Sequence, residues 1–162
     1  MALLLLALTA AAPRLPAQII VTGALGLPAK ASNPHLSTLS ARVGFGVALP
    51  PVPHLTVFWN LASLGYDRLQ AQNGASISTA FEAWVSPAFR PAQSFGPLLI
   101  GEAGVGRRFG LGLHGFTTLG AGLGWSLGDW IPYVEFRRRT SFHSGRPHDN
   151  EVLVGVHFMV FG

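Results

Sequence analysis

The sequence predicts an all-β protein, an eight-stranded antiparallel up-and-down barrel, on the strength of three observations. The 162 residues are 49% hydrophobic but only 11% charged, whereas a soluble domain carries about 25% charged residues. Outside the N-terminus, no uninterrupted apolar stretch reaches the roughly 18 residues that a membrane helix needs. Apolar and polar residues instead alternate with a period of two, which is the period of a β-strand.

The N-terminal segment, residues 1–17, is predicted to be a cleaved signal peptide. Met1 to Ala12 form an apolar run that is too short to span a membrane. Small residues place the cleavage site after Ala17, with Ala12 as the second choice. No Lys or Arg precedes the run, which departs from the usual signal pattern, and a buried N-terminal helix is the alternative. Residues 18–162 are then expected to form one exported domain.

Eight segments of this domain follow the strand period. The clearest is the last, where Glu151, Leu153, Gly155, His157 and Met159 alternate with β-branched or aromatic residues. Each segment is near the 9 to 11 residues that a tilted strand needs to cross a bilayer. In chain order, the predicted strands are about 18–27, 37–48, 55–65, 76–87, 97–107, 116–127, 130–139 and 151–161.

The joins between these strands are marked by proline, glycine and asparagine, which favour turns. Pro50–Pro53 and Gly128-Asp129 make short connections after the second and sixth strands. Longer connections are expected after the first, third, fifth and seventh strands, which carry Pro28, Asn33-Pro34, Asn73-Gly74, Gly110 and Pro147. Short turns that alternate with longer loops are typical of an outer-membrane barrel. The linker 88–96 fits this pattern least well because it is longer than a tight turn.

The distribution of charge indicates which face of the barrel meets lipid. The ionisable residues inside the strands fall mostly on one face, namely Arg42, Glu82, Glu102, Glu135, Arg137 and His157. The opposite face carries almost no charge, and a soluble protein cannot expose eight such strand faces to water without aggregating. A closed barrel satisfies its backbone without water, so we expect a transmembrane barrel. A soluble exported barrel that binds a small hydrophobic ligand is the alternative.

Over residues 18–162, the chain resembles the small outer-membrane β-barrels of bacteria, of the OmpA/OmpX type. The resemblance rests on the signal segment, the eight amphipathic strands and a last strand that ends in the letters HFMVF. It implies a monomer in the outer membrane, inserted by the barrel-assembly machinery, which reads a terminal aromatic residue. Here the aromatic Phe161 is followed by Gly162.

The interior of an eight-stranded barrel is just wide enough for its own side chains, which argues against a general diffusion pore. The six ionisable residues lie near mid-depth, and buried charges must be paired. We therefore expect an ion-pair and hydrogen-bond network that fills the lumen. A proton or ion path, or a catalytic carboxylate pair, is the alternative. Glycines such as Gly120 and Gly122 are expected to make room for Trp84 or Tyr133, because no helix follows them to form a nucleotide site.

A basic rim is predicted at the end of the barrel that carries the longer loops. Its residues are Arg68, Arg107, Arg108, Arg138 and Arg146. Alternation directs Arg138 outward and its neighbours Arg137 and Arg139 inward. Arginine suits phosphate contacts, so the expected partner is lipopolysaccharide, and no nucleic acid is expected. A solvated rim without a ligand is the alternative.

The last loop contains the components of a hydrolytic triad, Ser144, His143 and Glu151. In this respect the chain is similar to the lipid A deacylase barrels, in which one residue separates the His from the Ser and an Asn follows the Ser. Here His143 and Ser144 are adjacent, and Gly145 follows. We therefore expect a structural or envelope-related protein rather than an enzyme, with a deacylase-like hydrolase as the alternative.

Neither a cofactor nor a metal is expected. The chain has no cysteine, which excludes thiolate ligands and disulfides. His143, His148 and Asp149 share a loop, but their spacing repeats no known ligand pattern.

Overall fold

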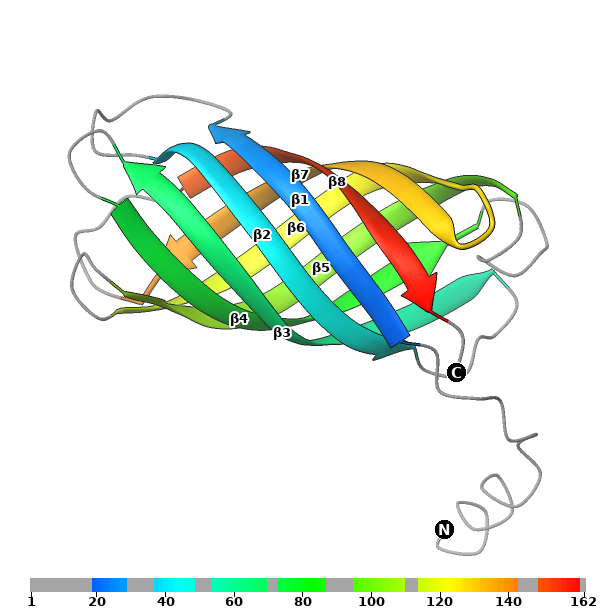
Figure 1. Ribbon diagram of the computed structural model, residues 1–162, viewed down its shortest axis with the longest axis horizontal. Helices are drawn as coiled ribbons and strands as arrows, with labels where there is room; N and C mark the ends of the chain where they lie inside the picture. The colour runs from blue at the N-terminus through cyan, green and yellow to red at the C-terminus, as the bar shows by residue number, and fades with distance from the viewer. Residues whose placement is uncertain are drawn as a thin grey trace, which may run out of the picture.

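A computed structural model describes residues 19–28, 37–48, 54–69, 73–86, 95–109, 114–142 and 149–160. These residues form one closed antiparallel barrel (Figure 1). Its strands are β1 (Ile19–Pro28), β2 (Ser37–Ala48), β3 (Leu55–Leu69), β4 (Asn73–Val85), β5 (Gly96–Phe109), β6 (His114–Ser126), β7 (Trp130–Ser141) and β8 (Asp149–Val160). The predicted fold class is confirmed. The predicted signal peptide, residues 1–17, lies outside the described residues.

Each strand pairs with its neighbours in sequence, and β1 closes the barrel against β8. That last ladder runs from the pair Ile19–Val160 to the pair Pro28–Glu151, so β1 begins and β8 ends at the same end of the barrel (Figure 1). We call this the terminal end. Strands β1, β3, β5 and β7 run toward the opposite end, which we call the loop end. Closure pairs the strand edges that would otherwise template aggregation.

The predicted alternation of short and long connections is confirmed only in part. Only residues 70–72 separate β3 from β4, where a longer loop was expected, whereas residues 86–95 separate β4 from β5. Asn73 and Gly74 belong to β4 because their ladder with β3 continues to the pair Arg68–Asn73. The short turn between β6 and β7 is as predicted, and Gly128 takes a φ of +77° there, a conformation that glycine adopts without a Cβ penalty. The described residues include no helix long and apolar enough to cross a membrane.

A bulge in β3 changes which of its residues face the lumen. Along β2, the partner of Phe45 is Ala62 but the partner of Gly46 is Asn60, so one residue is inserted. A bulge reverses the alternation of the strand beyond it. Asn60 and Ser63 are consequently both buried, and Asp67 faces inward with 1% of its surface exposed.

The outer face is apolar along most of its height. Leu25, Val43, Leu64, Leu119 and Leu123 are each at least 60% exposed on it. Aromatic side chains are exposed near both ends, with Tyr66, Phe109 and Phe142 at the loop end and Phe45, Trp125 and Trp130 at the terminal end. Such aromatic girdles flank the apolar band of outer-membrane barrels.

In the part of the wall that the structure describes, the exposed charged side chains lie at one end. They are Arg68, Arg107 and Arg138. Each lies within the last few residues of a strand that runs toward the loop end, respectively β3, β5 and β7. The apolar belt below them is therefore uncharged.

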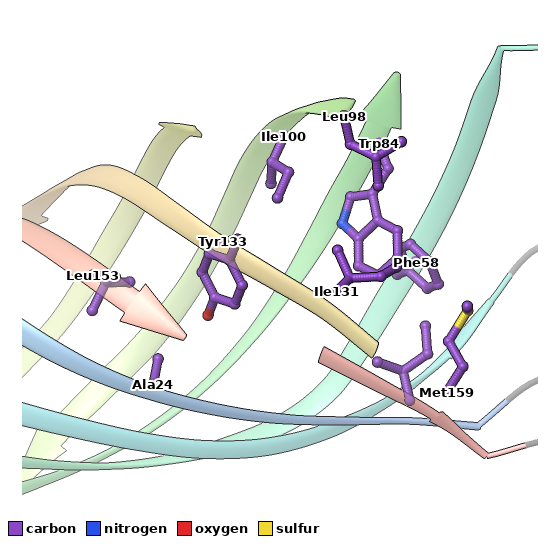
Figure 2. Close-up of a cluster of buried hydrophobic side chains, with 10 residues drawn as sticks. Ala24, Phe58, Trp84, Leu98, Ile100, Ile131, Tyr133, Leu153 and Met159 are labelled. Atoms are coloured by element: carbon purple, nitrogen blue, oxygen red, sulfur yellow. The ribbon is translucent and has the colours of Figure 1, made fainter. Parts of the chain in front are cut away.

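An apolar cluster fills the lumen toward the terminal end. Figure 2 shows Phe58, Trp84, Ile131 and Met159 together there, with Leu98 beside them. The ring of Trp84 is fully buried and lies 3.7 Å from that of Phe58, centroid to centroid. Close packing of this kind leaves no room for bulk water. The charged residues of the lumen lie on the side of this cluster that faces the loop end.

Candidate functional site: the charged lumen and the loop end

Arg42 on β2 organises the middle of the lumen. Its Nη1 donates to Oε2 of Glu102 on β5 at 2.6 Å, and its Nη2 donates to the hydroxyl of Tyr133 on β7 at 3.3 Å. The same Nη2 lies 4.0 Å from Oε2 of Glu135. One guanidinium therefore joins three strands that are not adjacent to one another.

His157 and Glu82 form a second pair at the border of the apolar cluster. His157 Nε2 lies 3.3 Å from Glu82 Oε2, and Nδ1 lies 2.8 Å from the hydroxyl of Thr22. The imidazole is stacked on Tyr133 and also contacts Trp84, at centroid distances of 4.3 and 4.8 Å. These contacts fix the ring on both sides.

Glu151 is the central hydrogen-bond acceptor in the part of the lumen nearer the loop end. Its Oε1 accepts from Nε of Arg137 at 2.7 Å and from Nη2 of Arg139 at 2.9 Å. Nη2 of Arg137 also donates to this oxygen. The other oxygen, Oε2, accepts from the hydroxyl of Ser40 at 2.7 Å. Both oxygens of a buried carboxylate are thus satisfied, as burial requires.

Asp67 extends the network toward the loop end. Its Oδ2 accepts from Nη1 of Arg139 at 2.8 Å and lies 3.2 Å from Nε of Arg108. Arg108 in turn donates to Asp149 at 2.8 Å. Because Arg137 also lies 3.7 Å from Glu102, the ion pairs form one connected series from Asp149 to Arg42.

The structure places all six residues of the predicted lumen network inside the barrel. Arg42, Glu82, Glu102, Glu135, Arg137 and His157 are each no more than 5% exposed. The observed network is larger than this set, because Asp67, Arg108, Arg139 and Glu151 are also buried in it. The sequence could have indicated that Arg108 faces inward, because it lies an even number of residues from Glu102 along β5 and therefore shares its face.

Only some residues of the predicted basic rim face outward. Arg68, Arg107 and Arg138 are exposed, whereas Arg108 is buried between Asp67 and Asp149. The expectation that Arg108 faces lipopolysaccharide is therefore wrong, because the alternation of β5 extends to the end of the strand and turns this side chain inward. Arg146 lies outside the described residues.

Of the three residues that a hydrolase would use, the structure describes only Glu151. Ser144 and His143 lie outside the described residues. The Glu151 carboxylate is bound by Arg137, Arg139 and Ser40 inside the lumen. Its described contacts are those of a buried ion-pair partner.

The inward glycines leave space for the network. A Cβ on Gly120 would lie 1.7 Å from Oε1 of Glu135, and a Cβ on Gly155 would lie 2.7 Å from the phenol of Tyr133. Glycines were expected to accommodate bulky rings. Gly155 does so for Tyr133, whereas Gly120 gives its space to a carboxylate.

A void of about 10 Å³ lies among Ser40, Asp67, Arg137, Arg139 and their neighbours. A polar cavity of this size holds about one water molecule. The arrangement can brace the strands against one another, and the apolar cluster separates it from the terminal end.

The sequence matches no protein-family model and none of the curated proteins compared with it. The solved structures that share the fold include two outer-membrane proteins. One is the outer membrane protein Ail of Yersinia pestis, with a TM-score of 0.54 and 12% identity over 90% of this chain and 99% of that chain. The other is the outer membrane enzyme PagL, with a TM-score of 0.51 and 16% identity over 87% and 98%. The chain therefore has the fold of the small eight-stranded outer-membrane β-barrels.

Proposed function

We propose that this protein resides in the bacterial outer membrane, where it has a structural or envelope-related role and a lumen sealed by its own side chains. One observation carries the proposal, namely the inverted arrangement of the two strand faces. Large apolar side chains cover the outside, and four arginines with five carboxylates are buried inside: Arg42, Arg108, Arg137, Arg139, Asp67, Glu82, Glu102, Glu135 and Glu151. Only a lipid environment makes such an outer face favourable.

The basic residues at the loop end support an orientation. Outer-membrane barrels of this class place the ends of strands such as β3, β5 and β7 outside the cell, beside the phosphates of lipopolysaccharide. Arg68, Arg107 and Arg138 are exposed there, and guanidinium groups bind phosphate bidentately. We propose that this rim contacts lipopolysaccharide.

Membrane extraction and electrophoresis test the location. We expect the protein to remain with the membrane fraction until detergent is added. We also expect the unboiled sample to migrate differently from the boiled one, because a closed barrel resists dodecyl sulfate. A protein that purifies from the aqueous fraction without detergent would instead support the soluble, ligand-binding barrel.

Conductance tests the sealed lumen. Glu82→Ala removes the carboxylate beside His157, so it should lower the free energy of unfolding while planar bilayers that contain the protein stay silent. If the variant conducts ions and remains as stable as the wild type, the lumen is a path rather than a plug.

A further inference from the structure

A groove of about 560 Å³ lies on the outer wall of the barrel, across β3 to β6. It is bounded by the larger side chains of Trp59, Phe81, Val105 and Leu119, with the small residues Ala103 and Gly104 between them. This volume lies within the range of small-molecule sites. Because the groove opens on the apolar face, its occupant in a bilayer is a lipid.

The groove offers hydrocarbon contacts rather than hydrogen bonds. Its indole and one of its hydroxyls are already paired, since Trp59 Nε1 donates to Thr79 Oγ1 at 3.0 Å and Thr79 donates to the carbonyl of Asn60 at 2.8 Å. Trp59 is also stacked on Phe81, with centroids 5.7 Å apart. The walls are thus held in place, and they suit an acyl chain.

The groove rises toward the loop end. The row of paired residues Trp59, Phe81, Ala103 and Leu119 crosses the four strands. Trp59 lies ten residues before the loop end of β3 at Leu69, whereas Leu119 lies only five residues from the loop end of β6 at His114. A bound lipid would place its polar headgroup at the side of the groove nearer the loop end.

Two exposed arginines lie at this side of the groove, nearer the loop end. Arg107 follows the groove residue Val105 by two positions on β5 and therefore shares its outer face. Arg138 pairs with the groove residue Leu119 across the β6–β7 ladder. Among the described residues, neither arginine has an ion-pair partner, so both guanidinium groups are available to an anion.

We propose that the groove binds an acyl chain of lipid A, with a phosphate of its headgroup on Arg107. The proposal rests on the proposed function, because the loop end must lie in the outer leaflet. An acyl chain matches the apolar walls, and phosphate matches the unpaired guanidinium. The same geometry gives neutral lipids only the first of these two contacts.

Native mass spectrometry of the full protein, released from mild detergent with added lipid A, tests the site. We expect a lipid A adduct on the wild type. Arg107→Gln removes a charge-assisted contact and should weaken binding about tenfold. Ala103→Phe fills the groove from an exposed position and should weaken binding by at least as much.

A matched variant serves as the control. Ala121→Phe adds the same ring on the outer face of β6, outside the groove. It should bind as the wild type does. The proposal is overturned if Arg107→Gln and Ala103→Phe also retain wild-type affinity, or if phosphatidylglycerol competes as well as lipid A.

The outcome is separable from a failure of the proposed function. Every variant is first extracted from membranes and tested for heat-modifiable migration. A wild-type protein that fails this step contradicts the outer-membrane location itself. An embedded barrel whose groove variants bind lipid A unchanged contradicts only the groove.

Discussion

Replacing Glu151 by leucine removes the carboxylate that Arg137, Arg139 and Ser40 share inside the lumen. The leucine side chain is similar in size but accepts no hydrogen bond. Two guanidinium groups then lose a partner at a buried site. The perturbation therefore tests whether the ion-pair network stabilises the barrel.

The expected loss of stability follows from the partners that remain. Breaking a buried ion pair by removing one member costs about 3 to 5 kcal/mol. Arg139 keeps Asp67 at 2.8 Å and Arg137 keeps Glu102 at 3.7 Å, so the loss should lie near the lower limit, about 3 kcal/mol. Glu151→Gln retains one acceptor oxygen and should cost about 1 to 2 kcal/mol.

The assay is reversible unfolding in urea of protein refolded into lipid vesicles, followed by tryptophan fluorescence. Asp149→Asn is the control, because Asp149 lies at the edge of the network and contacts Arg108 alone among the ion pairs of the described residues; its cost should be at most about 1 kcal/mol. If Glu151→Leu unfolds at the same urea concentration as the control, the network does not stabilise the fold and the reasoning is wrong.

Three further predictions concern the wall, the outer face and the last loop. Gly122→Ala should destabilise the barrel by about 1 to 3 kcal/mol in the same urea assay, because its Cβ would lie 2.2 Å from a backbone oxygen, whereas Gly101→Ala has open space and should be neutral. Leu123→Arg places a charge in the exposed apolar belt and should cost about 2 to 4 kcal/mol in vesicles; equal stability would contradict lipid contact there. Incubation of the purified protein with lipid A should release no fatty acid, and release that Ser144→Ala abolishes would show that it is an enzyme.

The alternation of residue types was sufficient to predict the barrel and the inner face of most strands. It worked for Glu135 and Arg137 because β7 is regular, with every second residue buried. It did not extend to Asp67, which follows the predicted strand 55–65 and faces inward because the bulge after Asn60 shifts the parity of β3. A bulge depends on the ladders with both neighbouring strands, and a single strand's sequence does not record it.

The ends of the strands were the other point of failure. Arg108 was expected in the outward basic rim, and Glu151 was a candidate for a triad in the last loop. In the structure Arg108 pairs with Asp67 on β3, and Glu151 pairs with Arg137, its neighbour on the β7–β8 ladder. The first pairing depends on the bulge that turns Asp67 inward and the second on the register of β7 and β8, so spacing along the sequence did not predict them. The outer groove depends on side chains from four strands and was equally invisible.

The central claim is that the apolar outer face contacts lipid while the charged face is sealed inside. Because the chain lacks cysteine, a single spin label can be attached at Leu123→Cys, on the exposed apolar face. The account predicts that, in vesicles, relaxation of this label is enhanced by oxygen dissolved in the bilayer and not by a water-soluble nickel chelate. The account would be contradicted if the nickel chelate relaxed the label strongly and oxygen dissolved in the bilayer did not.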